Sequence, residues 1–117
     1  MKTVLIVDDA AFMRNILKMM LERNNYKVTG EAENGKVAVS MYQSLKPDFV
    51  TMDITMPEMD GITAVKLIKQ IDSNAKVVMV TAMGQEAMIV DAVTAGAKGF
   101  IAKPFSEEYV IKTLSSL

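Results

Sequence analysis

Four runs of apolar residues in the sequence each end on a side chain that could do chemistry. VLIVDD ends on Asp8 and Asp9, DFVTMD on Asp53, VVMVT on Thr81, and GFIAK on Lys103. An apolar run that stops on a polar residue predicts a buried strand that delivers this residue to the edge of a sheet. Each residue alone could be a turn or cap residue, but the repeated arrangement predicts a shared site.

Strands and helices are expected to alternate five times along the chain. Strand-like apolar runs occupy residues 3–8, 27–32, 48–53, 76–81 and 98–102. Helical spacing of apolar residues covers residues 12–23, 35–45, 61–71, 85–95 and 106–117. This alternation predicts an α/β fold, with a doubly wound parallel sheet and helices on both of its faces. We expect five strands in the order 2-1-3-4-5, an order found in flavodoxin-like folds.

Capping residues support the limits of these helices. Asn34, Asp60 and Ser106 are predicted to cap the starts of three helices, and Gly96 to end another in the left-handed conformation. In the helix over 35–45, we expect an inward-facing stripe of Val37, Ala38, Met41, Tyr42 and Leu45.

Composition excludes several classes of function. The chain has 117 residues, which suits one compact domain, and its 13 Lys and Arg nearly balance its 14 Asp and Glu. Since it lacks a basic footprint, we expect no direct contact with nucleic acid. It has no cysteine and no histidine, which excludes disulfides, thiolate metal sites and histidine acid–base chemistry. No apolar run is long enough to span a membrane and no signal-peptide pattern is present, so we expect a cytoplasmic protein.

The predicted topology brings the polar strand ends together. In a parallel sheet the carboxyl ends of all strands lie at one edge, and ligands bind there, where the strand order reverses. For the order 2-1-3-4-5 this crevice lies between strands one and three, so Asp8, Asp9 and Asp53 are expected to converge. Thr81 and Lys103 approach the same place from the neighbouring strands.

Three neighbouring carboxylates repel one another, by roughly 4 kcal/mol for two charges about 4 Å apart at an effective dielectric constant of about 20. They remain ionised together only if cations lie among them. Lys103 supplies one positive charge, and a divalent metal would supply more. Because every available ligand is an oxygen, the sequence predicts Mg²⁺ as the cofactor, ahead of Mn²⁺.

A carboxylate beside Mg²⁺, a lysine and a hydroxyl can accept a phosphoryl group. Aspartate attacks phosphorus to form an acyl phosphate. The metal, the lysine and the hydroxyl then stabilise negative charge on the phosphoryl oxygens. The converging residues form a constellation of this kind.

Four motifs of the sequence resemble one family over the whole length of the chain. They are VDDAAFMR at 7–14, MDITMPEMDG at 52–61, VTAMG at 80–84 and KPF at 103–105. Together they resemble the receiver domains of two-component response regulators, and AMGQEAM is typical of stand-alone chemotaxis receivers. The resemblance implies one receiver domain over residues 1–117, with a flavodoxin-like (βα)5 fold.

The resemblance also implies a role for each residue of the predicted site. Asp53 would be the phosphorylated aspartate and a metal ligand, and Asp8 and Asp9 would be the acidic pair around Mg²⁺. Thr55 occupies the position that offers its main-chain carbonyl to the metal.

On the output side, the resemblance implies that Thr81 is the switch hydroxyl and Lys103 the lysine that contacts the phosphoryl group. The Lys103–Pro104 peptide bond would be cis, a state that occurs almost only before proline. Phe100 stands where many receivers carry Tyr or Phe as a rotameric switch. A phenylalanine can move inward when Thr81 shifts, but it cannot make the hydrogen bond of a tyrosine.

Partners follow from the same resemblance. Because the chain has no histidine, the phosphoryl donor is expected to be a phosphohistidine on a separate histidine kinase. A motor switch protein, or another output protein, would dock on the fourth helix, fifth strand and fifth helix. The fourth helix is apolar around more of its circumference than burial of one face needs, through Met88, Ile89, Val90 and Val93. A phosphatase is a further expected partner, a membrane is not, and the protein is expected to be a monomer.

Alternatives to this interpretation differ in what they need from the sequence. An aspartate-nucleophile phosphatase usually needs a second acid two residues after the nucleophile, where this chain has Thr55, so we expect no turnover of an external substrate. A flavin-binding module would need a glycine- and hydroxyl-rich loop where this chain has DDAAF. Within receivers, the alternatives are an intermediate in a sporulation-type phosphorelay and a receiver fragment of a larger transcriptional regulator. Binding of a motor switch protein or of a phosphotransferase would separate chemotaxis from the phosphorelay.

Overall fold

The computed structural model describes all residues from 1 to 117 as one parallel sheet with helices on both faces. The sheet order is β2-β1-β3-β4-β5, and each neighbouring pair is parallel. The strands are β1 Lys2–Val7, β2 Tyr26–Ala32, β3 Phe49–Asp53, β4 Val77–Thr81 and β5 Gly99–Ala102. The helices are α1 Ala11–Arg23, α2 Gly35–Leu45, α3 Gly61–Ile71, α4 Ile89–Ala95 and α5 Glu107–Ser115, with a 3-10 turn, η1, at Glu86–Met88. The predicted α/β fold and strand order are confirmed.

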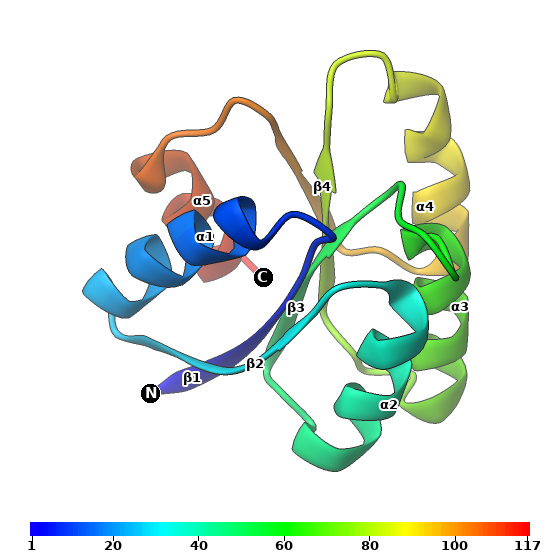
Figure 1. Cartoon of the computed structure of the whole chain (residues 1–117), viewed down its shortest axis with the longest axis horizontal. Helices are drawn as coiled ribbons and strands as arrows, with labels where there is room; N and C mark the ends of the chain where they lie inside the picture. The colour runs from blue at the N-terminus through cyan, green and yellow to red at the C-terminus, as the bar shows by residue number, and fades with distance from the viewer.

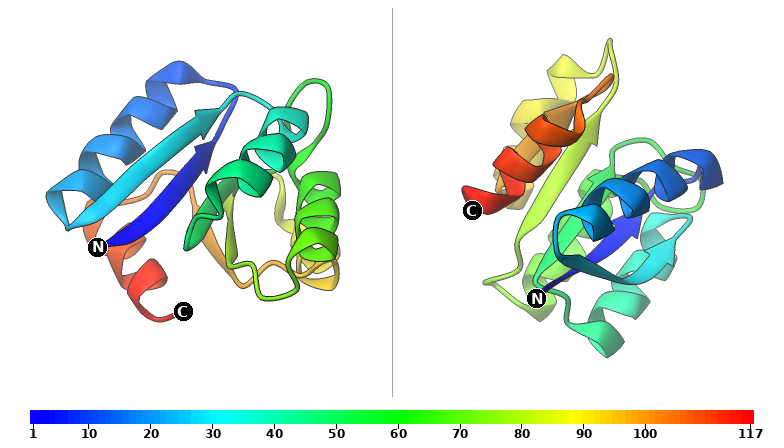
Figure 2. Two further views of the ribbon diagram at one scale, coloured as in Figure 1. Left: turned by 90° about the horizontal axis from the view of Figure 1, so that it is seen from below. Right: turned by 90° about the vertical axis from the view of Figure 1, so that its left-hand side faces the viewer.

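Two helix layers cover the sheet. α1 and α5 lie on one face, and α2, α3 and α4 lie on the other (Figure 1), an arrangement that the left view of Figure 2 also shows. The alternation of side chains along a strand explains the two layers. On β1, Val4 and Ile6 pack with the α1/α5 side, whereas Leu5 and Val7 belong to the larger cluster on the other side. A central strand covered on both faces therefore needs apolar residues at successive positions, as β1 has from Val4 to Val7.

The predicted caps are confirmed. The side chains of Asn34, Asp60 and Ser106 accept hydrogen bonds from backbone N–H groups in the first turns of α2, α3 and α5. Gly96 ends α4 with φ of 115°, in the left-handed region that glycine tolerates best. These four residues set the limits of the elements that carry the loops of the site.

The prediction of one helix over residues 85–95 is wrong in its first turn. Glu86–Met88 forms a 3-10 turn, and α4 begins only at Ile89. No side chain caps either start, and 3-10 turns are common where a helix begins without a strong cap. The last helix is also shorter than predicted, because it ends at Ser115.

Two residues of the predicted inward stripe on α2 are exposed. Val37 is 37% exposed and Leu45 is 38% exposed, whereas Ala38 and Tyr42 are buried. Ala38 and Tyr42 lie one turn apart and define the buried face. Val37 lies beside this face, and Leu45 lies in the last turn over β2, which is an edge strand with only one neighbour.

No helix of the structure has the length and apolar character needed to cross a membrane.

Candidate functional site

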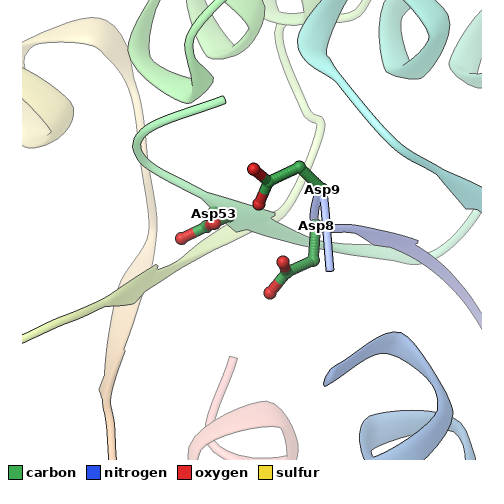
Figure 3. Close-up of side chains that lie close together, drawn as sticks. All are labelled: Asp8, Asp9 and Asp53. Carbon is green, nitrogen blue, oxygen red and sulfur yellow. The ribbon is translucent and has the colours of Figure 1, made fainter. Parts of the chain in front are cut away.

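Three carboxylates meet at the carboxyl edge of the sheet. Asp53 is the last residue of β3, and Asp8 and Asp9 follow β1, which is the neighbour of β3. The three side chains each bring a carboxylate oxygen within 4.8 Å of the others. Figure 3 shows the carboxylates turned toward one region beyond the strand ends. The convergence predicted from topology is therefore present.

The backbone holds two of these carboxylates in place. Asp8 and Asp53 are only 2% and 7% exposed, whereas Asp9 is exposed. The N–H of Ala10 donates to Asp8 Oδ1 at 2.9 Å, and the N–H of Ile54 donates to Asp53 Oδ1 at 3.1 Å. Each of these two carboxylates keeps a second oxygen that accepts no backbone hydrogen bond.

The charge at this edge is only partly balanced. Burial, followed by the neighbouring charge of Asp8, raises the pKa of Asp53 to about 6, although Lys103 acts in the opposite direction. Lys103 Nζ lies 3.5 Å from Asp8 Oδ2 and 3.7 Å from Asp53 Oδ1. Both distances exceed the 2.7–2.9 Å of a strong charge-assisted hydrogen bond. One lysine therefore leaves the cluster with an excess of negative charge.

Thr81 and Lys103 come from the next two strands, as predicted. Asp53 pairs with Val80, so Thr81 at the end of β4 lies one residue further toward the site, and it is buried. Lys103 follows β5, and its N–H donates to the Thr81 carbonyl at 2.7 Å. The Lys103–Pro104 peptide bond is cis.

Thr55 lies on the other loop of the site, two residues after Asp53. Its side chain is exposed, and its main-chain carbonyl accepts no hydrogen bond. Its Oγ1 accepts a hydrogen bond from Gln85 Nε2 at 2.9 Å. Gln85 lies within the AMGQEAM motif, but neither that motif nor the spacing of apolar residues indicates a partner for its side chain.

Phe100 lies in β5, away from the carboxylates. It is half-buried and packs against the larger core cluster. The Tyr109 hydroxyl, from α5, donates to the Phe100 carbonyl at 3.3 Å. Since Tyr109 is separated from Phe100 by a loop, this contact could not be read from the spacing of apolar residues.

The loop between β3 and α3 is fixed closely against Asp53. A Cβ at Gly61 would lie 2.0 Å from the Asp53 carbonyl oxygen, so only glycine fits there. The Gly61 N–H also donates to the Ile54 carbonyl at 2.7 Å. Within this loop Glu58 has φ of 67°, which few non-glycine residues adopt. Asp53 therefore sits on a backbone that has little freedom to move.

The donor set of the cluster fits a hard divalent cation. All three side chains offer carboxylate oxygens, and no nitrogen or sulfur ligand lies among them. Burial and the neighbouring charge of Asp8 raise the pKa of Asp53, and a bound cation would oppose both effects. Mg²⁺ prefers this combination of a few carboxylates with further oxygen ligands.

The response regulator receiver domain family matches this chain over residues 4–115. The chain belongs to this family. It is 57% identical to the chemotaxis protein CheY of Thermotoga maritima, over 99% of this chain and 97% of that protein. It is also 57% identical to CheY of Bacillus subtilis, over 96% of this chain and 93% of that protein.

Solved structures agree with this assignment. A chain in the CheX–CheY–BeF3–Mg²⁺ complex from Borrelia burgdorferi has a TM-score of 0.93 and 38% sequence identity to this one, covering 98% of this chain and 87% of that chain. The resemblance predicted from the four motifs is confirmed, and so is the flavodoxin-like receiver fold. The chain is a signalling domain of the two-component type.

Proposed function

We propose that this chain is a chemotaxis receiver that takes a phosphoryl group from a histidine kinase onto Asp53 and thereby changes its affinity for an output protein. The observation that carries the proposal is the meeting of Asp8, Asp9 and Asp53 with Lys103 at one edge of the sheet. The relatives named as chemotaxis proteins support the pathway. Residues 1–117 would form one receiver domain.

The phosphoryl transfer needs Asp53 in its ionised form. A carboxylate oxygen of Asp53 attacks the phosphorus of the kinase phosphohistidine, and the P–N bond breaks. The imidazole nitrogen keeps the bonding electron pair, and the product is an acyl phosphate on Asp53. Lys103 Nζ lies 3.7 Å from Asp53 Oδ1 and can form an ion pair with the phosphoryl oxygens once they are attached.

Asp8, Asp9, Asp53 and the main-chain carbonyl of Thr55 are the groups that would hold Mg²⁺. When bound, the ion supplies the positive charge that lets three carboxylates and a phosphoryl group coexist. The chain itself contributes the positions of these oxygens, fixed by the ends of β1 and β3.

We propose that the acyl phosphate is a signal and not a step in the turnover of an external substrate. Thr55 stands two residues after Asp53, where a phosphatase would carry a general acid. A threonine hydroxyl cannot act as a strong acid at neutral pH. The chain would thus promote its own phosphorylation and dephosphorylation only.

The proposed output runs through Thr81 and Phe100. A pocket of about 200 Å³ is lined by Thr81, Lys103 and Ile89, the first residue of α4. It gives the Thr81 region room to rearrange when a phosphoryl group arrives. Phe100, half-buried on the next strand, is the large side chain that would follow.

The surface that would change lies on α4, β5 and α5. Met88 at the end of η1 is 41% exposed, and Val90 and Val93 on α4 are 70% and 53% exposed, so burial does not explain the apolar character of this segment. We propose that a motor switch protein or another output protein docks there, and that a phosphatase acts on the phosphorylated form.

The test is phosphorylation by acetyl phosphate in the presence of Mg²⁺, followed by mass spectrometry. The wild type should gain one phosphoryl group, and Asp53→Asn should gain none while keeping its fold by circular dichroism. Asp91→Asn, which removes an exposed carboxylate on α4, is the matched control and should label like the wild type. Labelling of Asp53→Asn at the wild-type rate would show that another residue is the acceptor.

A further inference from the structure

The side chain of Gln85 connects the two loops that flank Asp53. Its Oε1 accepts a hydrogen bond from the N–H of Ala82 at 2.7 Å, and its Nε2 donates to Thr55 Oγ1 at 2.9 Å. Ala82 directly follows Thr81 at the end of β4, and Thr55 lies two residues beyond the end of β3. We call this pair of hydrogen bonds the Gln85 bridge.

The N–H of Ala82 points toward β3, the strand that carries Asp53. In a parallel sheet, the N–H and C=O of one residue face the same neighbouring strand, and successive residues alternate between the two neighbours. The Thr81 carbonyl faces β5, since it accepts the N–H of Lys103. The N–H of the next residue, Ala82, must therefore face the opposite side.

This N–H has no partner in the sheet. If the pairing of β3 with β4 continued beyond Asp53 and Val80, the Ala82 N–H would donate to the Ile54 carbonyl. The structure has no such bond, and the Ile54 carbonyl accepts the Gly61 N–H at 2.7 Å instead. Gln85 therefore supplies, from its side chain, the acceptor that the sheet does not.

A phosphoryl group on Asp53 would offer a stronger acceptor to the same N–H. It adds nearly two negative charges and three acceptor oxygens. A hydrogen bond to a charged oxygen is roughly twice as strong as one to a neutral amide oxygen. We propose that Gln85 is a positioning residue that occupies the Ala82 N–H in the unphosphorylated chain and releases it to a phosphoryl oxygen on Asp53; this inference rests on the proposed function.

The loop held by the Gln85 bridge has few other contacts. Gly84 has φ of 91° and no atom within 4 Å of where a Cβ would lie, and Met83 is 88% exposed. The backbone bond from the Gln85 N–H to the Ala82 carbonyl, at 3.2 Å, is local to the same turn. Release of the side chain would therefore free the loop to close on a phosphoryl group.

The experiment measures the dissociation constant of beryllofluoride, a non-covalent mimic of the phosphoryl group, in the presence of Mg²⁺ by NMR titration of the intact chain. Gln85→Ala removes the competitor and should bind beryllofluoride about five-fold more tightly. Thr55→Val removes only one of the two bonds and keeps the main-chain carbonyl, so its gain should be smaller. Gln85→Glu places a charged acceptor on the Ala82 N–H and should bind more weakly than the wild type.

The control is Gln70→Ala, which removes an exposed glutamine on α3 and should leave the dissociation constant unchanged. A general loosening of the loop would affect Gln85→Ala and Gln85→Glu in the same direction, which would overturn the inference. An unchanged or weaker affinity of Gln85→Ala would also overturn it while leaving the proposed function intact. If the wild type binds beryllofluoride no better than Asp53→Asn, the proposed function itself fails.

Discussion

Aspartates at the two ends of the sheet have opposite energetic roles. At the carboxyl edge, burial and the charge of Asp8 raise the pKa of Asp53 to about 6. At the amino edge, just before the same strand, a backbone hydrogen bond from Thr3 holds the pKa of Asp48 below its ordinary value. Folding disfavours the ionised form of Asp53 and favours that of Asp48.

Hydrogen bonding explains the difference between the two edges. Asp48 Oδ2 accepts the N–H of Thr3 at 2.8 Å and its hydroxyl at 3.1 Å. Asp72, also at the amino edge, accepts the Asn74 N–H and the Tyr42 hydroxyl, and these lower the pKa of its carboxyl. The charges that shift these two pKa values come from nearby lysines and the N-terminus, and they lower both values. The amino edge thus uses aspartates to stabilise the fold, whereas the carboxyl edge keeps them in a costly arrangement suited to a cation and a phosphoryl group.

Bound Mg²⁺ should offset most of the charge repulsion that makes the carboxyl edge less stable than the amino edge. The ion binds the folded cluster and not the unfolded chain, so at about 100 times its dissociation constant it should raise the free energy of unfolding by about 2.7 kcal/mol. Asp9→Ala should lose most of this gain, and Asp48→Ala, at the other edge, should keep it. Urea unfolding with and without the metal measures the effect. An unfolding midpoint that does not respond to Mg²⁺ would contradict a metal site here.

Asp53→Asn should stabilise the metal-free protein because it removes a buried charge that Asp8 repels. We expect a gain of about 2 kcal/mol near pH 8, since water at the mouth of the site screens part of the repulsion. Because folding raises the pKa of Asp53, the ionised carboxyl destabilises the folded state and its neutral replacement should stabilise it. Well below its unfolded pKa of about 3.9, Asp53 is protonated in both states. As the pH rises through the folded pKa of about 6, the buried carboxyl ionises and the fold loses this stability. The gain from Asp53→Asn should therefore shrink near pH 5. Equal gains at both pH values in urea unfolding would show that charge is not the cause.

Asp48→Ala should have the opposite sign and the smallest effect. Loss of the hydrogen bonds with Thr3 should destabilise the protein by about 1 kcal/mol at neutral pH. Because the pKa of Asp48 is lowered on folding, this stabilisation is present above the unfolded pKa and is lost in acid. Thermal unfolding at neutral and acidic pH would measure it, with Asp91→Ala as an exposed control. A larger effect in acid than at neutral pH would be inconsistent with this account.

Much of the site could be predicted because topology places it. Once the strand order is known, the residues that follow β1 and β3 must be neighbours, so residue type and chain order suffice for Asp8, Asp9 and Asp53. The caps were predictable for a similar reason, since Asn34 and Asp60 bind N–H groups only three residues away.

Contacts that depend on side-chain reach could not be predicted. The Gln85 bridge joins residues 30 positions apart, and no spacing rule selects Thr55 as the partner of Gln85. The start of α4 was missed because a 3-10 turn and an α-helix have nearly the same apolar spacing over one turn. The predicted core position of Leu45 is wrong because helical periodicity shows which side chains share a face and not how fully the neighbouring strand covers them.

The lack of room at Gly61 gives the two sides of the site different mechanical stiffness. A Cβ there would collide with the backbone of Asp53, so β3 and the start of α3 behave as one solid part. Across the site, the turn at Gly84 has open space around it. The backbone on the α3 side of Asp53 is closely packed, whereas the turn on the α4 side has room to move. We therefore expect a movement that starts at Asp53 to be transmitted toward α4 and not toward α3.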